Sequence, residues 1–206
     1  MRPGFDTLPA PPYSGAELPF RREVTKAVGV LSSQQIRALL GAPTRLVSEF
    51  IDLDDQLQAN GFDLTLGSIG TFRTAGSIGP LNDRVLADTT ELPFDERGLV
   101  KLAPGPYLVR LNEVVSLPSN VMAIARPRSS LLRSGAAVHN AVWDAGYSGR
   151  SQVLVVVYNP QGLELAMGAR IVQMVFMTLD TATDSPYAGL FQHEALDPVE
   201  QPPRTT

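Results

Sequence analysis

The chain has 206 residues, a formal net charge of −4, 17 glycines, 17 prolines and no cysteine. This length fits one large domain or, less easily, two small ones, and the missing cysteine excludes disulfides, thiolate nucleophiles and cysteine-ligated zinc. The acidic balance disfavours a nucleic-acid partner, and the lack of a long apolar run or a signal-peptide plan predicts a cytoplasmic protein with no membrane partner.

The N-terminal part of the sequence predicts an arm followed by one short helix. Residues 1–20 are rich in proline and show no sustained period, so residues 1–25 are expected to form an extended arm. Ser32 then precedes apolar residues at helical spacing, and Gly41 follows them. A serine N-cap and a glycine stop predict a short helix between these two positions.

From residue 50 onward the pattern changes to short runs of period two, which is typical of strands. Phe62, Leu64 and Leu66 alternate with polar residues and predict a half-buried strand closed by Gly67. Residues 73–98 are expected to form a loop with at most one strand. Further strands are predicted over residues 106–111, 121–126, 152–158, 163–166 and 171–179.

The strand predicted over residues 152–158 is nearly all β-branched and aliphatic, so both of its faces are expected to be buried. The many glycines and prolines suit short strands and tight turns better than long helices. We therefore predict an all-β fold, a jelly-roll-like barrel or sandwich with one short N-terminal helix, in one domain over residues 26–195. Residues 196–206 are expected to form a mobile tail.

Two polar clusters follow predicted strands in the second half of the chain. Arg128, Ser129 and Ser130 combine a guanidinium, two hydroxyls and free backbone amides, a mixture that suits a phosphate, although a solvated turn is the alternative. Asp144 lies between Trp143 and a tight turn, where it would orient and deprotonate a water molecule. It would otherwise only shape the loop as an Asx-turn.

Two further polar residues lie inside apolar strand patterns. Gln173 needs partners for its amide and Asp63 needs a counter-charge, from a ligand or from the chain itself. Tyr147 could cover a flat ring or belong to the core. His139 and His193 are the only histidines, so we predict no protein metal site. No Gly-x-Ser-x-Gly elbow supports a serine nucleophile.

Taken in order, these clusters resemble the four motifs of the dUTPase/dCTP deaminase superfamily. The motif-like segments are Gly61–Leu64, Pro127–Leu131, Trp143–Gly149 and Gly168–Phe176. The resemblance spans roughly residues 50–195. It implies a jelly-roll-like β fold, a homotrimer with sites at subunit interfaces, and a Mg²⁺ ion that the substrate triphosphate holds.

The resemblance also implies roles for individual residues. Asp144 would activate the attacking water, Asp63 would support the water network on the metal side, and Tyr147 would pack on the deoxyribose. The main chain around His139 and Asn140 would read uracil. The expected contacts with the rest of the substrate are Arg128, Ser129, Ser130, Gln173 and Gln192, the last within a lid over residues 186–194.

One position separates the two activities of the superfamily. Its deaminases carry a glutamate that shuttles protons in the strand after the third motif, and here that position is Val156. This favours hydrolysis of dUTP to dUMP and pyrophosphate, as in the archaeal-type members. Arg133 and the segment around Tyr187 are closer to the deaminases. A mono- or bifunctional dCTP deaminase and a catalytically silent nucleotide-binding relative therefore remain alternatives.

Overall fold

The computed structural model describes residues 29–42, 45–81 and 83–196. The predicted arm over residues 1–25 lies outside the described residues, as does the predicted tail beyond Leu196. The helices in the described part are α1 (Ser33–Leu40), α2 (Leu53–Gln56) and α3 (Ser129–Arg133). None of these described helices is long and apolar enough to span a membrane.

The helix predicted after Ser32 is confirmed as α1. The Ser32 hydroxyl accepts a hydrogen bond from the Gln35 amide at 3.4 Å, and the Gln35 side chain accepts one from the Ser32 amide at 2.9 Å. This reciprocal cap satisfies two donors at the start of the helix. Gly41 caps the other end, and Ile36 and Leu40 face the core.

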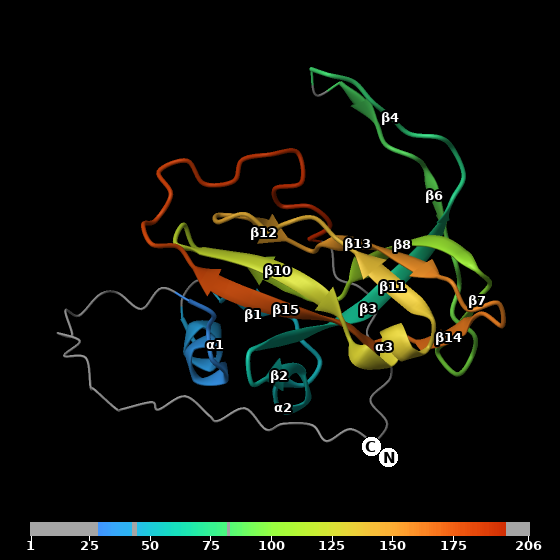
Figure 1. Cartoon of the computed structure of the whole chain (residues 1–206), viewed down its shortest axis with the longest axis horizontal. Coiled ribbons are helices and arrows are strands. Elements are labelled where there is room, and N and C mark those ends of the chain that lie inside the picture. The colour runs from blue at the N-terminus through green and yellow to red at the C-terminus, as the bar shows by residue number, and fades with distance from the viewer. Residues whose placement is uncertain (1–28, 43–44, 82, 197–206) are drawn as a thin grey trace, which may run out of the picture.

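One curled antiparallel sheet forms the body of the molecule (Figure 1). Its strands, in spatial order, are β10 (Val121–Pro127), β15 (Arg170–Thr178), β3 (Gly61–Phe72), β8 (Gly105–Leu111), β13 (Gln152–Val157) and β11 (Ala136–His139). The two end strands, β10 and β11, contact each other, so the sheet is nearly a closed barrel. The predicted all-β, jelly-roll-like fold is confirmed.

Shorter strands extend the sheet or close its ends. β2 (Leu57–Gln58) and β6 (Thr89–Glu91) pair with β3. A smaller sheet joins β1 (Val47–Ser48), β9 (Val114–Ser116) and β12 (Ser148–Gly149), while β7 (Leu99–Leu102) pairs with β14 (Leu163–Ala166). The strands predicted over residues 106–111, 121–126, 163–166 and 171–179 all occur within one residue of their expected ends.

The core lies inside the barrel and is filled by alternate residues of the strands. Val155 of β13 and Met174 and Phe176 of β15 are fully buried. Complete burial of one such side chain stabilises the fold by about 1.5–3 kcal/mol. The alternating apolar residues of the strands therefore supply the side chains that fill this core.

The strand around Asp63 is longer and more deeply buried than predicted. β3 continues past Gly67 to Phe72 and is buried on both faces from Gly61 to Gly70. A Cβ at Gly67 would lie 3.0 Å from the Arg110 carbonyl oxygen, and the register with β8 shifts beside it. The glycine therefore permits a bulge within the strand and does not end it.

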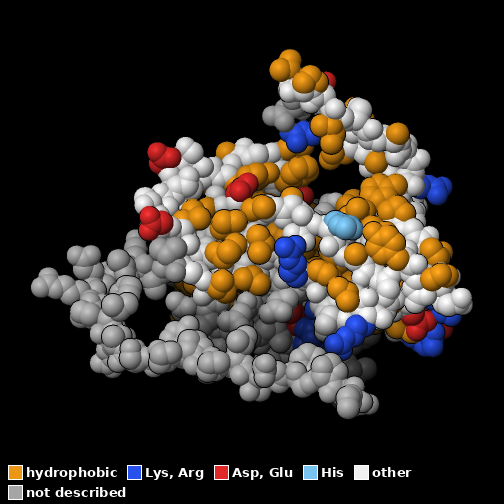
Figure 2. All heavy atoms as spheres, viewed as in Figure 1, with side chains coloured by type: hydrophobic (Ala, Val, Ile, Leu, Met, Phe, Trp, Pro, Cys, Tyr) orange, Lys and Arg blue, Asp and Glu red, His pale blue; other side chains and the backbone are white. Residues whose placement is uncertain are grey.

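The segment over residues 73–98 was expected to hold at most one strand, and this is wrong. β4 (Ser77–Ile78) and β5 (Arg84–Val85) pair in a hairpin that projects from the barrel, and β6 follows it (Figure 1). Hydrophobic side chains gather at the projecting end (Figure 2), and Ile78 and Leu81 of this segment are 86% and 89% exposed. These strands have no buried face, so they leave no alternation in the sequence.

Burial of β13 on both faces was predicted, and in this chain only one face is fully buried. Val153, Val155 and Val157 point into the core, whereas Leu154 and Val156 are half-buried on the outer face. An aliphatic sequence predicts that both faces of a strand are buried, but it does not predict whether the residues that bury them belong to the same chain.

Candidate functional site

Asp63 is the most enclosed of the predicted site residues. It lies in β3 with 0% of its surface exposed. Its carboxylate forms an ion pair with Arg128 and a second one with Arg170, whose Nη1 lies 3.7 Å from Oδ2. Within the described chain no hydrogen-bond donor satisfies either carboxylate oxygen. A buried charge needs compensation, and here two guanidiniums supply it.

The two arginines face both Asp63 and solvent. The side chain of Arg128 is 28% exposed and that of Arg170 is 36% exposed. Burial and, to a lesser extent, the positive charge of Arg170 lower the pKa of Arg128. Two guanidiniums share one carboxylate and keep open faces, so this cluster has surplus positive charge and suits an anionic ligand.

Gln173 lies beside this pair because of strand register. It is aligned with Asp63 of β3 on one side and with Arg126 of β10 on the other, so the three side chains share one face of the sheet. Gly61 leaves room for it, since a Cβ there would lie 3.1 Å from Gln173 Nε2. The Gln173 side chain makes no hydrogen bond in the described chain, which leaves its amide available to a ligand.

Ser129 and Ser130 lie at the start of α3 and not in the predicted turn. Arg128 is the N-cap residue of this helix, and its amide donates to the Ile171 carbonyl at 3.0 Å. Both serines are exposed, and amides at the start of a helix have no preceding turn to bond. Hydroxyls and amides are therefore presented next to Arg128, as the phosphate hypothesis requires.

Asp144 lies on an anchored loop and its carboxylate is free. Trp143 pairs with Ala123 through the main chain, and its indole Nε1 donates to Ser151 Oγ at 2.6 Å. The turn after Asp144 is closed by its carbonyl, which accepts from the Tyr147 amide at 3.1 Å. The exposed carboxylate forms no hydrogen bond or ion pair in the described chain. The structure thus does not support the Asx-turn alternative.

Tyr147 is buried within the same chain. Its hydroxyl donates to Glu194 Oε1 at 2.9 Å and lies 3.1 Å from Ser151 Oγ. Its ring meets Tyr187 edge-on with centroids 5.8 Å apart. Burial raises the pKa of the Tyr147 hydroxyl. The predicted contact of this ring with a deoxyribose stays a prediction.

Gln192 uses both ends of its amide inside the chain. Its Oε1 accepts from the Ser148 amide at 2.9 Å, and its Nε2 donates to the Gly146 carbonyl at 3.0 Å. These bonds tie the C-terminal segment to the loop that follows Asp144. Its expected role as a substrate contact also stays a prediction.

The predicted site residues form two groups in the chain. The first is the arginine cluster: Asp63, Arg128, Ser129, Ser130 and Gln173. The second is the loop group: His139, Asn140, Asp144, Tyr147 and Gln192. His139 ends β11 and is exposed, and Asn140 Nδ2 donates to the Ala141 carbonyl at 3.0 Å. Within the described chain no hydrogen bond or ion pair joins the two groups.

Arg170 and a polar network behind Asp63 belong to this region although no role was predicted for them. Glu113, which is fully buried, accepts hydrogen bonds from the Thr65 amide at 2.9 Å, the Thr65 hydroxyl at 2.7 Å and Gln56 Nε2 at 2.7 Å. Gln56 Nε2 also donates to the Asp63 carbonyl at 2.8 Å. Glu113 lies in the short connection between β8 and β9, where its sequence neighbours form no motif that would predict a buried carboxylate.

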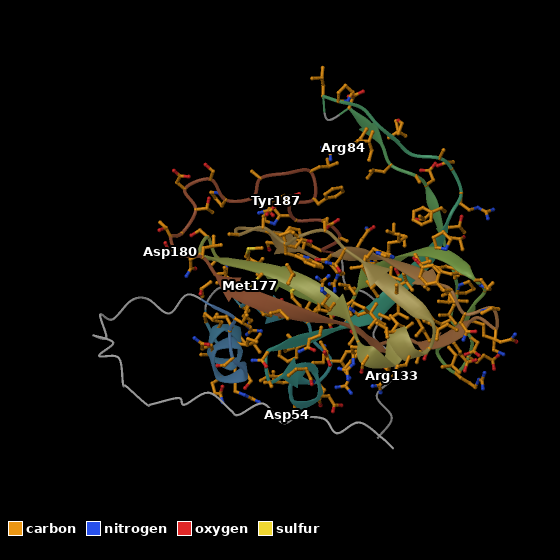
Figure 3. The ribbon with its side chains drawn as sticks, in the orientation of Figure 1. Asp54, Arg84, Arg133, Met177, Asp180 and Tyr187 are labelled. Atoms are coloured by element: carbon orange, nitrogen blue, oxygen red, sulfur yellow. The ribbon has the colours of Figure 1, made fainter. Side chains whose placement is uncertain are left out.

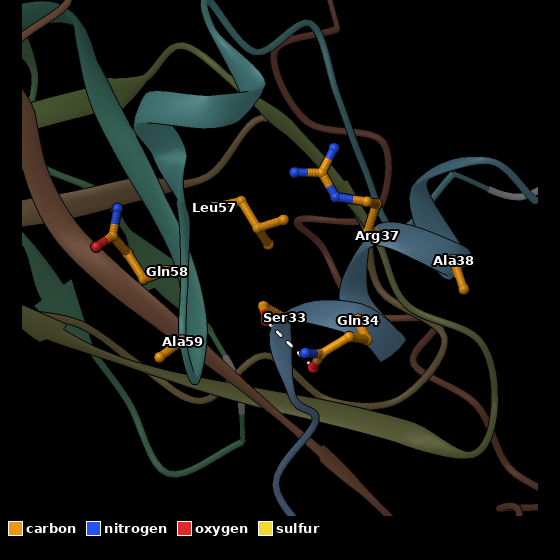
Figure 4. Close-up of a pocket in the computed structure, with 7 residues that line it drawn as sticks. All are labelled: Ser33, Gln34, Arg37, Ala38, Leu57, Gln58 and Ala59. Atoms are coloured by element: carbon orange, nitrogen blue, oxygen red, sulfur yellow. Dashed lines mark hydrogen bonds between the residues drawn. The ribbon is translucent and has the colours of Figure 1, made fainter.

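A groove of about 610 Å³ lies between α1 and β2 (Figure 4). Its walls include Arg37 and Gln58, and the Arg37 guanidinium is paired with Asp54 at 3.2 Å. None of the predicted site residues lines this groove. The arginine cluster and the loop group, and not the groove, are therefore the candidate site.

The chain was compared with known proteins. A family model described as dCTP deaminase-like matches residues 30–179. A relative from Methanosarcina mazei, named probable deoxyuridine 5′-triphosphate nucleotidohydrolase, is 44% identical over 168 residues, which cover 81% of this chain and 98% of that protein. A relative of the same name from Archaeoglobus fulgidus is 45% identical over 171 residues, which cover 82% of this chain and 99% of that protein.

A solved structure is also similar to this chain. The 2′-deoxycytidine 5′-triphosphate deaminase from Agrobacterium tumefaciens matches with a TM-score of 0.56 and 28% identity over 73% of this chain. The match covers 48% of that structure, so this chain spans about half its length. The resemblance found in the four motifs is thereby confirmed. The chain belongs to the dCTP deaminase-like family of the dUTPase/dCTP deaminase superfamily.

Proposed function

We propose that this chain hydrolyses dUTP to dUMP and pyrophosphate. The archaeal relatives, which bear the name of deoxyuridine 5′-triphosphate nucleotidohydrolases, support both the substrate and the reaction class. In the structure, the observation that carries the proposal is the free carboxylate of Asp144 on a rigidly anchored loop.

Asp144 would act as the general base. A water molecule oriented by this carboxylate gives up a proton to it as the water oxygen attacks the α-phosphorus. The bond from that phosphorus to the bridging oxygen then breaks, and pyrophosphate leaves. An exposed carboxylate with no partner among the described residues can accept that proton without first breaking one of their hydrogen bonds.

The arginine cluster would bind the phosphates. Arg128 offers a bidentate donor, and the hydroxyls of Ser129 and Ser130 lie next to it at the start of α3. When Arg128 turns toward a phosphate, Arg170 would remain as the counter-charge of the buried Asp63. Gln173 would donate its free amide from the same face of the sheet.

Mg²⁺ would enter with the triphosphate. Among the described residues no three His, Cys, Asp or Glu side chains gather into a metal site. Mg²⁺ commonly binds through substrate phosphates and keeps several waters, so the donors present fit an ion held by the substrate. Bound there, it would neutralise charge on the phosphates, and Asp63 is the carboxylate in the cluster proposed to support the water network on the metal side.

The strand register supports hydrolysis over deamination. Val156 is aligned with Ala137, two residues before His139, so its side chain shares a face with the segment expected to read the base. A glutamate at this position would point toward a bound base. Valine there has no proton to transfer. The residues aligned with it on the two neighbouring strands, Pro106 and Ala137, have no acidic side chain that could take the place of the glutamate.

We also propose that the active form is a homotrimer. The half-buried Leu154 and Val156 leave an apolar outer face on β13, and among the described residues no hydrogen bond or ion pair joins the arginine cluster to the loop group. A site completed across a subunit interface would account for both features. Light scattering of the purified protein should give three times the mass of one chain, and a monomer would contradict this proposal.

The direct test is incubation of the purified protein with Mg²⁺ and either dUTP or dCTP, followed by separation of the products. We expect dUMP and pyrophosphate from dUTP and no change in dCTP. Conversion of dCTP to dUTP or dUMP would show instead that the chain is a deaminase and that a residue other than Val156 transfers the proton.

Replacing the general base tests the mechanism. Asp144→Asn should keep the fold and lower kcat on the order of 10²- to 10⁴-fold. Asp180→Asn, which alters another exposed aspartate (Figure 3), is the matched control and should leave kcat unchanged. A near-normal rate for Asp144→Asn would show that another group activates the water.

A further inference from the structure

Arg126 lies next to the arginine cluster and adds a third guanidinium, after those of Arg128 and Arg170, to this part of the surface. It belongs to β10, where the preceding Ala125 is buried and points into the core. Alternation along the strand turns the Arg126 side chain outward. Arg126 is exposed, and among the described residues it forms no hydrogen bond or ion pair. Its guanidinium is therefore free to bind a ligand.

Strand register places Arg126 in line with two polar residues of the cluster. Arg126 is aligned with Gln173 of β15, and Gln173 is aligned with Asp63 of β3. Neighbouring strands lie about 4.8 Å apart, so Gln173 is the direct neighbour of Arg126, and Asp63 lies roughly 10 Å from it. The Gln173 side chain makes no hydrogen bond within the described part of the chain. A free guanidinium and a free amide thus lie side by side.

The remaining outer face of these two strands is apolar, which sets Arg126 apart from an ordinary surface charge. The outward side chains further along the strands are half-buried and hydrophobic: Met122, Ile124, Val175 and Met177. Figure 2 shows hydrophobic side chains gathered over β10 and β15. The effective dielectric constant is lower beside apolar side chains than in open water, so a guanidinium at this place attracts an anion more strongly.

The spacing of Arg126 and Arg128 suits a chain of phosphates better than a single phosphate. The two residues are two positions apart, which corresponds to about 6.6 Å along an extended strand. One phosphate bound by Arg128 and the start of α3 would leave Arg126 without a partner. A triphosphate lying along β10 is longer and can contact both guanidiniums. Among the described ion pairs, Asp63 is the only carboxylate that compensates an arginine of this group.

We propose that Arg126 and Gln173 form a subsite for a further phosphate of a polyphosphate chain, next to the subsite at Arg128 and the start of α3. Arg126 is then a substrate-binding residue that favours a triphosphate over shorter anions. This inference rests on the proposed function, since it extends the phosphate site of the proposed hydrolysis. A guanidinium suits this role because its charge is permanent and its donors match two phosphate oxygens at once.

Inorganic anions of different length test the subsite without any assay of activity. Titration calorimetry compares the binding of tripolyphosphate and of orthophosphate to the wild type and to Arg126→Ala. We expect a loss of affinity on the order of tenfold for tripolyphosphate and of less than about twofold for orthophosphate. The single phosphate should bind at Arg128, where hydroxyl and amide donors add to the guanidinium. Arg126→Lys keeps the charge but not the paired donors, so it should restore part of the loss.

The kinetics with dUTP should show the same residue at work. Arg126→Ala should raise KM on the order of tenfold and leave kcat within about threefold of the wild type, since the lost contact holds the substrate both before and during the reaction. Arg84→Ala is the matched control. Arg84 is an exposed arginine of β5 (Figure 3) that forms no hydrogen bond or ion pair with the described residues. This control should change neither anion binding nor KM.

The outcomes separate this inference from the proposed function. If the wild type does not cleave dUTP, the hydrolysis proposal fails, while the anion titrations still decide whether Arg126 binds phosphates. Equal affinity of Arg126→Ala and the wild type for tripolyphosphate would overturn the inference, as would equal losses for the two anions. A lower mass of Arg126→Ala in light scattering, with unchanged anion affinity, would also overturn it, because Arg126 would then serve a contact between chains.

Discussion

Asp63 and Glu113 are both fully buried carboxylates, and their surroundings are opposite. Asp63 is compensated by two partly exposed guanidiniums, Arg128 and Arg170. Glu113 is surrounded by neutral donors, and burial raises its pKa despite them. Gln56 touches both regions, because its Nε2 donates to the Asp63 carbonyl and to Glu113 Oε1.

The difference separates the region proposed to bind phosphates from a structural one. The partners of Asp63 are long cationic side chains that can turn toward a ligand, whereas the partners of Glu113 belong to the packed interior. The Glu113 network therefore holds β3 in place, and the arginine cluster offers positive charge to an anion. Four measurements test this difference between the two carboxylates.

The largest expected effect is on stability. Glu113→Ala leaves the Thr65 amide, the Thr65 hydroxyl and one bond of Gln56 unsatisfied, which should lower the free energy of unfolding by roughly 3–5 kcal/mol. Urea denaturation at neutral pH measures it. Glu164→Ala, which removes a half-exposed carboxylate 3.9 Å from Lys101 Nζ, is the control and should change the value by less than about 1 kcal/mol. Equal changes in the free energy of unfolding for Glu113→Ala and Glu164→Ala would show that the buried network of Glu113 does not stabilise the fold more than a surface carboxylate does.

Arg128→Ala should affect both stability and binding. Breaking a buried ion pair costs about 3–5 kcal/mol when no second partner remains, and Arg170 remains here, so we expect about 2 kcal/mol. Titration calorimetry should show a larger loss of affinity for dUTP than for dUMP, because the lost guanidinium serves the outer phosphates. Equal losses of affinity for dUTP and dUMP would show that Arg128 does not contact the outer phosphates.

The pH dependence of stability should carry the signature of Glu113. Its pKa is raised above 4.5 in the folded state by burial, so the folded chain keeps this proton to higher pH than the unfolded chain does. Stability should therefore fall as the pH rises from about 4.5 through the folded pKa. Glu113→Gln should lack that decline in urea denaturation at a series of pH values. Burial also raises the pKa of Glu194, so this residue adds a decline of stability with rising pH to the wild type and to Glu113→Gln alike.

The smallest effect is expected at the surface pair of Arg37 and Asp54, whose side chains are mostly exposed. Arg37→Ala should change the free energy of unfolding by about 0.2–1 kcal/mol, since exposed ion pairs are weak and screened by salt. The same urea denaturation checks it. If Arg37→Ala lowered the free energy of unfolding as much as Arg128→Ala, burial would not explain the difference between the Arg37–Asp54 and Arg128–Asp63 ion pairs.

Much of the fold and part of the site could be predicted from the sequence. Alternating and continuous apolar runs located five of the six strands of the main sheet, and Ser32 and Gly41 located α1. The four polar clusters pointed to Asp63, Arg128, Asp144 and Gln173 because each departs from a simple local pattern. The hairpin of β4 and β5 and the strand β11 were missed, since they carry no strong alternation.

Local patterns of alternation and capping act over a few residues, so they were enough to predict the β class, the helix α1 and the polar positions that interrupt the strands. Which of those positions meet depends on the packing of strands that lie far apart in the sequence. Register between β15 and β3 brings Arg170 and Gln173 to Asp63, although more than 100 residues separate them. The contact of Glu194 with Tyr147 likewise spans 47 residues. Such contacts depend on how distant segments pack, and no local pattern encodes that.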